Sequence, residues 1–394
     1  SGATEYTLAP DEAHRVLRVT CTGMLDVALA RTMITEARLS AAEWGFSLLY
    51  DLTGVTLSAN ITEIFEFPKS LEVYREARTL AIPVAFAAAA APPDAHKPPD
   101  AVAAPDAEQL FRAVVKVSAR AVPNARSAAS LGSAREGTGV LIGSDGLIVT
   151  IGYLIVEADE VTVTDHRGRV LPAVVVGYDH ASGFGLLRAI VPIDATPVAL
   201  GASARMAETD PVMIASHGGV DDAAFAWVVS KRPFTGNWEY MLDEALWTSP
   251  PTSAWSGAAL IDRDGKLVGV GSLIVRDATG DEPRLPGNLF VPIDALKAVL
   301  AELVADGRRK GPARPWLGVA ADEVQGRLIV SRVSPDSPAD EAGVQVGDII
   351  LGVAGESVRT QGEFYRKLWA GRSAGAEVPL RLLQGADVRE LEVR

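Results

Sequence analysis

The spacing of hydrophobic and polar residues predicts a small α/β domain in residues 1–91. Strand-like alternation and helix-like spacing take turns along this segment, which is typical of a sheet covered by helices. The predicted elements are a strand at 15–23, a helix at 24–45, a strand at 46–55, a helix at 61–78 and a strand at 79–89.

From about residue 108 the pattern changes to short β-rich runs separated by turns. Many short strands of this kind predict an all-β barrel or sandwich. An amphipathic segment at 292–307 predicts a helix that closes the region. Residues 316–394 form a further unit, with short strands and one predicted helix at 361–372. The sequence shows no internal repeat.

Two proline-bearing segments separate these units. Proline and alanine dominate residues 92–107, and residues 308–315 are basic. Proline neither joins a β-ladder nor continues a helix, so both segments are predicted to be linkers. The predicted domains are therefore 1–91, 108–307 and 316–394.

Composition argues against several classes of protein. The net charge of −13 repels phosphate backbones, so a nucleic-acid partner is not expected. Cys21 is the one cysteine and the five histidines are scattered, so neither a disulfide nor a metal or cofactor is expected. No apolar run is long enough to span a bilayer, and the first residues lack a secretion signal. We expect a cytoplasmic protein; the alternative is the periplasm, with a signal removed.

Four segments of the middle region carry recognisable motifs. They are EGTGVLIGSDGLIVTIGYLIVEADEVTVT (136–164), GRVLPAVVVGYDHASGFGLLRA (168–189), AWSGAALIDRDGKLVGVGS (254–272) and LFVPIDALKAVLAEL (289–303). In order and spacing they resemble the HtrA/Deg family of trypsin-like serine proteases. The resemblance implies an all-β chymotrypsin-like double barrel.

The same resemblance implies a catalytic triad that has lost two of its members. Tyr153 stands where the family has histidine, Gly183 where it has aspartate, and Ser256 keeps the nucleophile position. A serine hydroxyl needs an adjacent base, and a phenol with a pKa of about 10 is protonated at neutral pH. We therefore expect a pseudoprotease. Ser256 is then either a residual nucleophile or a small residue kept by a tight turn.

The family's oxyanion hole also differs here. Its two backbone N–H groups correspond to Ala254 and Ser256, and Ala254 replaces a glycine. Alanine resists backbone conformations that glycine adopts easily. The bulky Trp255 replaces the neighbouring asparagine.

Two other interpretations of the cleft stay open. His217 matches a loop near the oxyanion side, and it is the histidine best placed to act as a replacement base with Ser256. The chain would then be an active serine endopeptidase. In the other interpretation, the cleft holds a small ligand between Trp255, Tyr153 and His217.

The C-terminal unit resembles a PDZ domain of the same family. PWLGV (315–319) is similar to the carboxylate-binding loop, and VSPDSPADEAGVQVGDIILGVAGESV (333–358) is similar to the core motifs. The resemblance implies binding of protein C-termini or extended peptides by strand addition.

The same likeness assigns roles within the PDZ unit. The groove is expected between a strand at about 326–332 and the helix from Gln361. Phe364 and Leu368 either line its pocket or are ordinary helix core. The carboxylate would be held by the backbone N–H groups of Leu317, Gly318 and Val319.

The N-terminal domain resembles the STAS modules of anti-sigma-factor antagonists. LLYDLTGVTLSANITEI (48–64) is similar to their strand-to-helix segment, which often carries a phosphorylatable serine. Ala59 and Asn60 occupy the matching positions, with Ser58 nearby, so a phosphoswitch is not expected. A generic α/β interaction domain is the alternative.

These features predict a non-catalytic scaffold or adaptor. It would bind peptides through its PDZ domain and a protein partner through its N-terminal domain. Family protease domains often form trimers, and the sequence leaves the oligomeric state open.

Overall fold

The computed structural model describes residues 5–13, 15–25, 27–57, 107–219, 222–282 and 284–394. The chain divides into two compact units, Ser1–Ala101 and Val102–Arg394. The predicted helix at 61–78, the predicted strand at 79–89 and nearly all of the 92–107 linker lie outside the described residues. The same holds for the STAS-like positions Ser58, Ala59 and Asn60.

The described part of the first unit is a mixed sheet with one helix. The central strand β2 (Val16–Leu25) pairs antiparallel with β1 (Glu5–Asp11) and parallel with β3 (Ser47–Leu57). Parallel neighbours need a crossover connection, and the helix α1 (Val27–Trp44) supplies it. The predictions for 15–23, 24–45 and 46–55 are confirmed, whereas β1 was not predicted. β1 is a half-exposed edge strand, so its hydrophobic pattern is weak.

The second unit contains two closed barrels with the same strand order. The strands follow one another around the barrels in the orders β4-β5-β6-β9-β8-β7 and β10-β11-β12-β15-β14-β13. In both barrels, therefore, the first three strands lie in sequence order and the last three in reverse order. Full closure leaves neither barrel with an unpaired edge. The first barrel consists of β4 (Val114–Ala121), β5 (Ala134–Leu141), β6 (Leu147–Ile151), β7 (Ala158–Thr164), β8 (Val170–Tyr178) and β9 (Phe184–Ala189).

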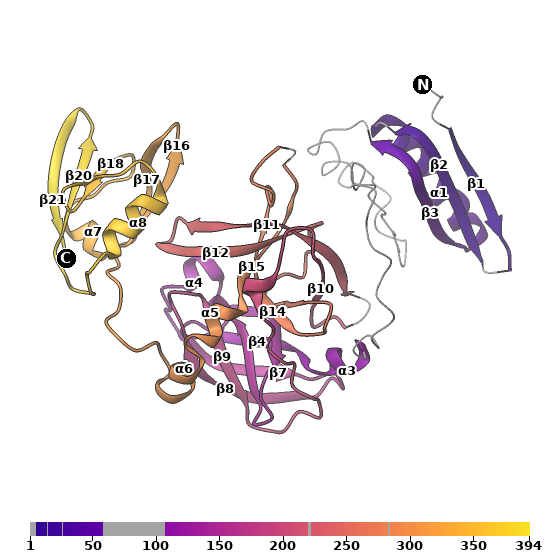
Figure 1. Cartoon of the computed structure of the whole chain (residues 1–394), viewed down its shortest axis with the longest axis horizontal. Helices are drawn as coiled ribbons and strands as arrows, with labels where there is room; N and C mark the ends of the chain where they lie inside the picture. The colour runs from indigo at the N-terminus through magenta and orange to yellow at the C-terminus, as the bar shows by residue number, and fades with distance from the viewer. Residues whose placement is uncertain (1–4, 14, 26, 58–106, 220–221, 283) are drawn as a thin grey trace. The chain divides into compact units, whose positions relative to one another are not determined.

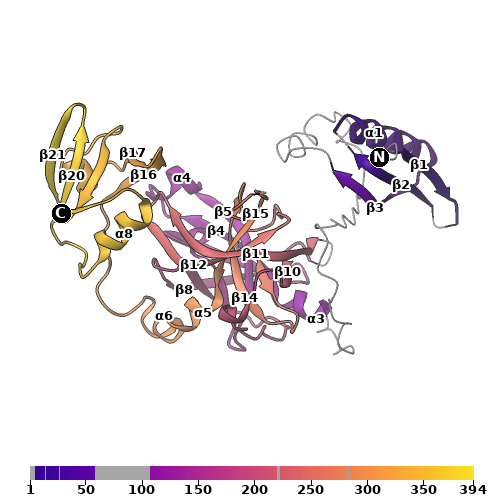
Figure 2. The same cartoon turned by 45° about the horizontal axis from the view of Figure 1, so that its top comes forward.

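The second barrel repeats this topology without an obvious repeat in the sequence. It consists of β10 (Pro211–Ala215), β11 (Ala224–Gly236), β12 (Tyr240–Ser249), β13 (Ala259–Ile261), β14 (Leu267–Val275) and β15 (Gly287–Pro292). Figures 1 and 2 show the strands of the two barrels packed side by side. One large apolar core joins them, because buried residues such as Leu187 and Leu289 belong to the same cluster. The prediction of an all-β double barrel is confirmed.

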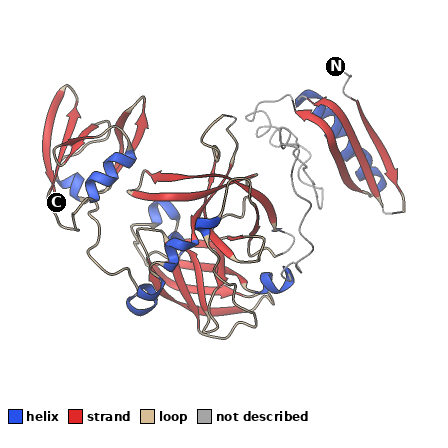
Figure 3. Ribbon diagram, viewed as in Figure 1, coloured by secondary structure: helices blue, strands red, loops and turns tan. Residues whose placement is uncertain are grey.

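Helices are short in this part of the chain, as Figure 3 shows. The single helix predicted at 292–307 is wrong in one respect, because α5 (Ile293–Lys297) and α6 (Leu300–Asp306) are separate helices. Val299 between them has φ −127° and ψ −1°, which interrupts the helical backbone. The other helices are α3 (Ala107–Arg112) and α4 (Ala128–Leu131), and the 3₁₀ turns are Gly152–Leu154 and Ser203–Arg205.

The C-terminal domain is a sheet in the order β16-β17-β18-β20-β21, with β19 paired to β18. Its helix α8 (Gln361–Trp369) begins at Thr360, whose side chain accepts a hydrogen bond from the Glu363 N–H at 3.2 Å. The predicted helix at 361–372 is therefore confirmed, although it ends three residues early. The other elements are β16 (Val319–Val324), β17 (Arg327–Val333), α7 (Pro338–Glu341), β18 (Ile349–Val353), β19 (Glu356–Ser357), β20 (Val378–Gln384) and β21 (Asp387–Val393).

Within the described ranges, no helix combines the length and the hydropathy that crossing a bilayer requires.

The second barrel core offers a matched pair of phenylalanines for a stability test. Phe290 on β15 is 0% exposed, whereas Phe225 on β11 is 71% exposed. We expect Phe290→Ala to lower the free energy of unfolding by about 3–5 kcal/mol, since it leaves a cavity. Phe225→Ala should change it by no more than about 0.5 kcal/mol. Urea denaturation followed by tryptophan fluorescence measures both, and equal effects would contradict this core.

Candidate peptidase cleft and PDZ carboxylate site

The three triad positions meet at the junction of the two barrels. Tyr153 lies in the 3₁₀ turn after β6, and its hydroxyl oxygen is 2.9 Å from Ser256 Oγ, just before β13. The neighbouring Gly152 N–H donates to the Gly183 carbonyl at 2.7 Å, which places the β8–β9 loop beside them. The structure therefore brings together Tyr153, Gly183 and Ser256.

The Tyr153 hydroxyl also lies 2.9 Å from the Ser272 carbonyl oxygen. A phenol has one proton, so Tyr153 donates to only one of these two neighbours. A carbonyl can only accept, whereas the Ser256 hydroxyl can do either. The arrangement that satisfies both contacts directs the tyrosine proton to Ser272 and the serine proton to the tyrosine oxygen.

That tyrosine oxygen is a poor base. Burial raises the pKa of Tyr153 to about 12, although hydrogen bonds with the Ser256 and Trp255 side chains act in the opposite direction. The phenol is therefore neutral at physiological pH, and it holds the serine hydroxyl without taking its proton.

The space beside Gly183 is already filled. Gly183 has φ +85°, a conformation that residues with a side chain rarely adopt. A Cβ added there would lie 3.0 Å from the hydroxyl oxygen of Tyr240, which comes from β12. Tyr240 is buried and donates to the Ser182 carbonyl at 2.5 Å. An aspartate at position 183 would therefore be destabilised both by its left-handed backbone and by the close contact of its side chain with the Tyr240 hydroxyl.

The turn that carries Ser256 depends on the next residue. Gly257 has φ +74°, and a Cβ there would lie 2.0 Å from the Thr138 carbonyl oxygen. The Thr138 N–H donates to the Ser256 carbonyl at 2.8 Å. Ala254, predicted as an oxyanion donor, has no left-handed backbone and donates its N–H to Thr252 Oγ1 at 3.2 Å. This contact engages one of the two predicted oxyanion donors.

His217 lies near this turn but bonds to a different residue. Its Nδ1 is 3.0 Å from Thr138 Oγ1, and its backbone N–H donates to the same oxygen at 3.1 Å. Among the hydrogen bonds of the described residues, none joins His217 to Ser256. Burial, assisted by the charge of Lys116, lowers the pKa of His217. Of the three residues predicted to wall a ligand site, Tyr153 and Trp255 interact, while His217 is held by Thr138.

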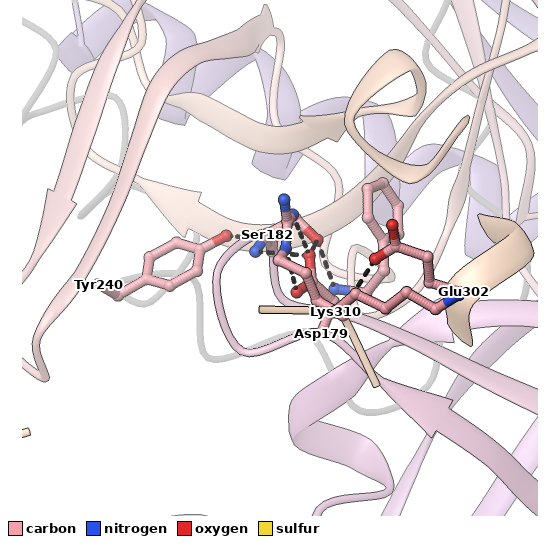
Figure 4. A network of polar contacts seen from close by, with 7 residues as sticks. Asp179, Ser182, Tyr240, Glu302 and Lys310 are labelled. Carbon is pink, nitrogen blue, oxygen red and sulfur yellow. Dashed lines mark hydrogen bonds and ion pairs between the residues drawn. The ribbon is translucent and has the colours of Figure 1, made fainter. Parts of the chain in front are cut away.

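A buried carboxylate, which the sequence analysis did not identify, fixes the loop that carries Gly183 (Figure 4). Asp179 is 2% exposed and accepts two hydrogen bonds from Arg309, at 3.0 and 2.8 Å, and one from Ser182 Oγ at 2.5 Å. The next residue, Lys310, donates its N–H to Glu302 at 2.7 Å. The start of the predicted 308–315 linker is thus tied to the first barrel and to α6. No sequence motif marks a pair 130 residues apart.

Burial by itself would raise the pKa of Asp179. The hydrogen bonds from Arg309 and Ser182, together with the arginine charge, outweigh this and lower it. The carboxylate is therefore charged and paired over the whole neutral range.

The loop predicted to hold a peptide carboxylate surrounds a glutamate side chain of the same chain. The N–H groups of Leu317, Gly318 and Val319 donate to the side chain of Glu239 at 2.9, 2.7 and 3.0 Å. Gly318 has φ +82°, and a Cβ there would lie 2.2 Å from Ser337 Cβ. Only glycine therefore fits this position of the loop, and its three N–H groups point at one carboxylate.

The predicted position of the peptide groove needs a correction. The strand expected beside it, at 326–332, is β17, which is paired on both sides by β16 and β18. Strand addition needs an unpaired edge, and β16, directly after the carboxylate loop, is the edge strand of the sheet. Phe364 and Leu368 are 1% and 0% exposed and belong to the PDZ core.

Comparison with known proteins gives two domain matches. Residues 137–270 match the trypsin-like peptidase domain, and residues 315–394 match the PDZ domain. The serine endoprotease DegS of Haemophilus influenzae is 30% identical over 222 residues, 55% of this chain and 64% of that protein. A probable periplasmic DegP-like serine endoprotease of Pseudomonas putida is 30% identical over 285 residues, 68% of this chain and 56% of that protein.

A solved structure of the serine endoprotease from Yersinia pestis covers 72% of this chain and 94% of its own, at 24% identity and a TM-score of 0.43. The barrels and the two domain matches define a trypsin-like peptidase fold joined to a C-terminal PDZ domain. In domain composition the chain is similar to the HtrA-type serine endoproteases it matches. It spans about half to two thirds of the length of the first curated relatives it matches.

The Asp179–Arg309 pair leads to a pH-dependent stability difference. Because folding lowers the pKa of Asp179 below its ordinary value of 3.8, its stabilisation is complete above that value. It is lost as the pH falls through the folded-state pKa. We expect Asp179→Asn to destabilise the protein by about 1–3 kcal/mol at pH 7, with the difference shrinking below about pH 4. Thermal unfolding across this pH range measures it.

The exposed turn residue Asp264 provides the control for this experiment. Asp264→Asn should follow the wild type at every pH. A stability gap for Asp179→Asn that stays constant from neutral to acid pH would contradict the charge-based explanation.

Proposed function

We propose that this chain is a peptide-binding HtrA-type protein without peptidase activity. The observation that carries the proposal is the contact between the Tyr153 hydroxyl and Ser256 Oγ at 2.9 Å. A neutral phenol takes the place of the imidazole that would accept the serine proton. The Tyr240 hydroxyl beside Gly183 supports the proposal further, because it fills the space where an orienting carboxylate would lie.

The second candidate is an active serine endopeptidase. Its support is that the relatives reported above are named serine endoproteases, and that Ser256 is retained. His217 is the candidate base, and its pKa is lowered, so the imidazole would be neutral. Its bond to Thr138 would have to give way to a bond with Ser256.

The proposal extends to the other domains. The PDZ domain would bind free C-termini or extended peptides along β16, and the N-terminal domain, read as 1–91, would bind a protein partner. We also propose that this N-terminal domain is a STAS-like module. Several relatives are named as periplasmic proteins, which supports the periplasmic alternative rather than the cytoplasm.

Ser256-dependent chemistry separates the two candidates. We expect casein digestion and fluorophosphonate labelling to be the same for the wild type and for Ser256→Ala, since the hydroxyl is not deprotonated. Turnover or labelling that disappears in Ser256→Ala would reject the proposal. If His217→Ala abolished that activity equally, the endopeptidase candidate would replace it.

Binding of a free C-terminus tests the PDZ part. We expect fluorescein-labelled decapeptides ending in Val, Leu or Phe to bind the full chain, and their C-terminal amides not to bind. Gly318→Ala should weaken binding by at least about tenfold, because the added methyl collides with Ser337 and displaces the loop N–H groups.

Gly326→Ala is the matched control for this measurement. Gly326 also has a positive φ, of +70°, but a Cβ there meets nothing within 4 Å. Its backbone cost is similar, and the carboxylate loop stays intact. Equal weakening by the two substitutions, measured by fluorescence anisotropy, would argue against binding at the loop.

A further inference from the structure

The turn between β11 and β12 carries a carboxylate into the PDZ loop. Glu239 lies at this turn, one residue before β12, and its side chain accepts from three successive backbone N–H groups, the nearest at 2.7 Å. Hydrogen bonds to an ionised acceptor are about twice as strong as those between neutral groups. This is the arrangement in which a PDZ loop holds the terminal carboxylate of a peptide.

Further contacts hold the same turn against the PDZ domain. The Tyr365 hydroxyl on α8 donates to the Gly236 carbonyl at 2.7 Å and accepts from the Glu239 N–H at 3.2 Å. Asn237 Nδ2 donates to Asp322 Oδ1 on β16 at 3.1 Å. Met241, 7% exposed, packs into the apolar core of the PDZ domain. The turn thus contacts the loop, the edge strand and the helix that would receive a peptide.

Glu239 occupies the left-handed position of the hairpin loop. Its φ is +58°, which is usual for the last residue of a short loop such as the one between the paired residues Gly236 and Tyr240. Burial raises the pKa of its carboxyl group, and the three backbone N–H groups act in the opposite direction. No ion pair of the described residues includes Glu239, so the loop is the group that compensates its burial. The hairpin turn therefore presents the Glu239 side chain, and the loop N–H groups hold its carboxylate.

We propose that Glu239 is an internal ligand of the PDZ domain, so that a peptide C-terminus binds only after displacing the β11–β12 turn. This inference rests on the proposed carboxylate-binding function of the loop. Three N–H groups accommodate one carboxylate at a time, so the docked turn and a bound peptide exclude each other. A cavity of about 610 Å³ borders Trp238, Glu239 and the 308–316 segment, which leaves room beside the docked turn.

The exclusion has a quantitative consequence. When only a fraction of molecules has a free loop, the apparent dissociation constant equals the intrinsic constant divided by that fraction. Weakening the internal ligand therefore raises the apparent affinity for a peptide without changing any contact that the peptide makes. A contact that merely positioned the two domains would not have this effect.

The test compares full-length variants with the same labelled decapeptides. Glu239→Gln keeps the shape and removes the charge, and Glu239→Ala removes the ligand. Tyr365→Phe removes two hydrogen bonds to the turn without altering the loop. We expect the Glu239 variants to bind free-carboxylate peptides about tenfold more tightly than the wild type, and Tyr365→Phe to bind them more tightly as well. Glu244→Gln, an exposed glutamate on the same strand β12, should bind like the wild type.

Equal affinities of the wild type and both Glu239 variants would overturn the inference. If no peptide binds any variant, the proposed PDZ function fails, and a second readout decides the internal ligand separately. In ¹⁵N-edited NMR spectra, the amide signals of Leu317, Gly318 and Val319 should move in Glu239→Gln and stay in place in Glu244→Gln. Unmoved loop signals in Glu239→Gln would overturn the inference irrespective of any peptide.

Discussion

The hydrogen-bonded contact between Tyr153 and Ser256 is the interaction on which the chemistry of the cleft depends. It joins the first barrel to the segment before β13, and it occupies the side of the serine hydroxyl where a base would act. A buried phenol with a pKa of about 12 stabilises a hydroxyl without activating it. The two barrels therefore bring together two neutral hydroxyl groups whose hydrogen bonds are satisfied.

The contact between Tyr153 and Ser256 is supported by further residues around the β8–β9 loop. Tyr240 fills the space beside Gly183. The ion pair of Asp179 with Arg309 fixes the β8–β9 loop, which carries Gly183. Tyr240 follows Glu239 directly in the sequence, so adjacent residues contact the β8–β9 loop and the loop at Gly318. The β11–β12 hairpin thus connects these two loops physically.

Motifs short in sequence were predicted well. The loop at 315–319 needs glycine at position 318 for its left-handed backbone. Three N–H groups of this loop donate to the carboxylate of Glu239. Tyr153, Gly183 and Ser256 come together because the order of the barrel strands places their loops side by side. The edge strand of the PDZ sheet was misplaced by one strand, since pairing partners cannot be read from the alternation of one segment.

By itself the sequence determined the all-β class through its local periodicity, and the PDZ unit through the resemblance of its motifs. Only the tertiary structure decided that Asp179 pairs with Arg309 and that Glu239 enters the loop at Gly318. It also decided the break between α5 and α6 and the shared topology of the two barrels. The contacts of Asp179 and Glu239 join residues some 80 to 130 positions apart. They arise from three-dimensional packing, which no local sequence pattern records.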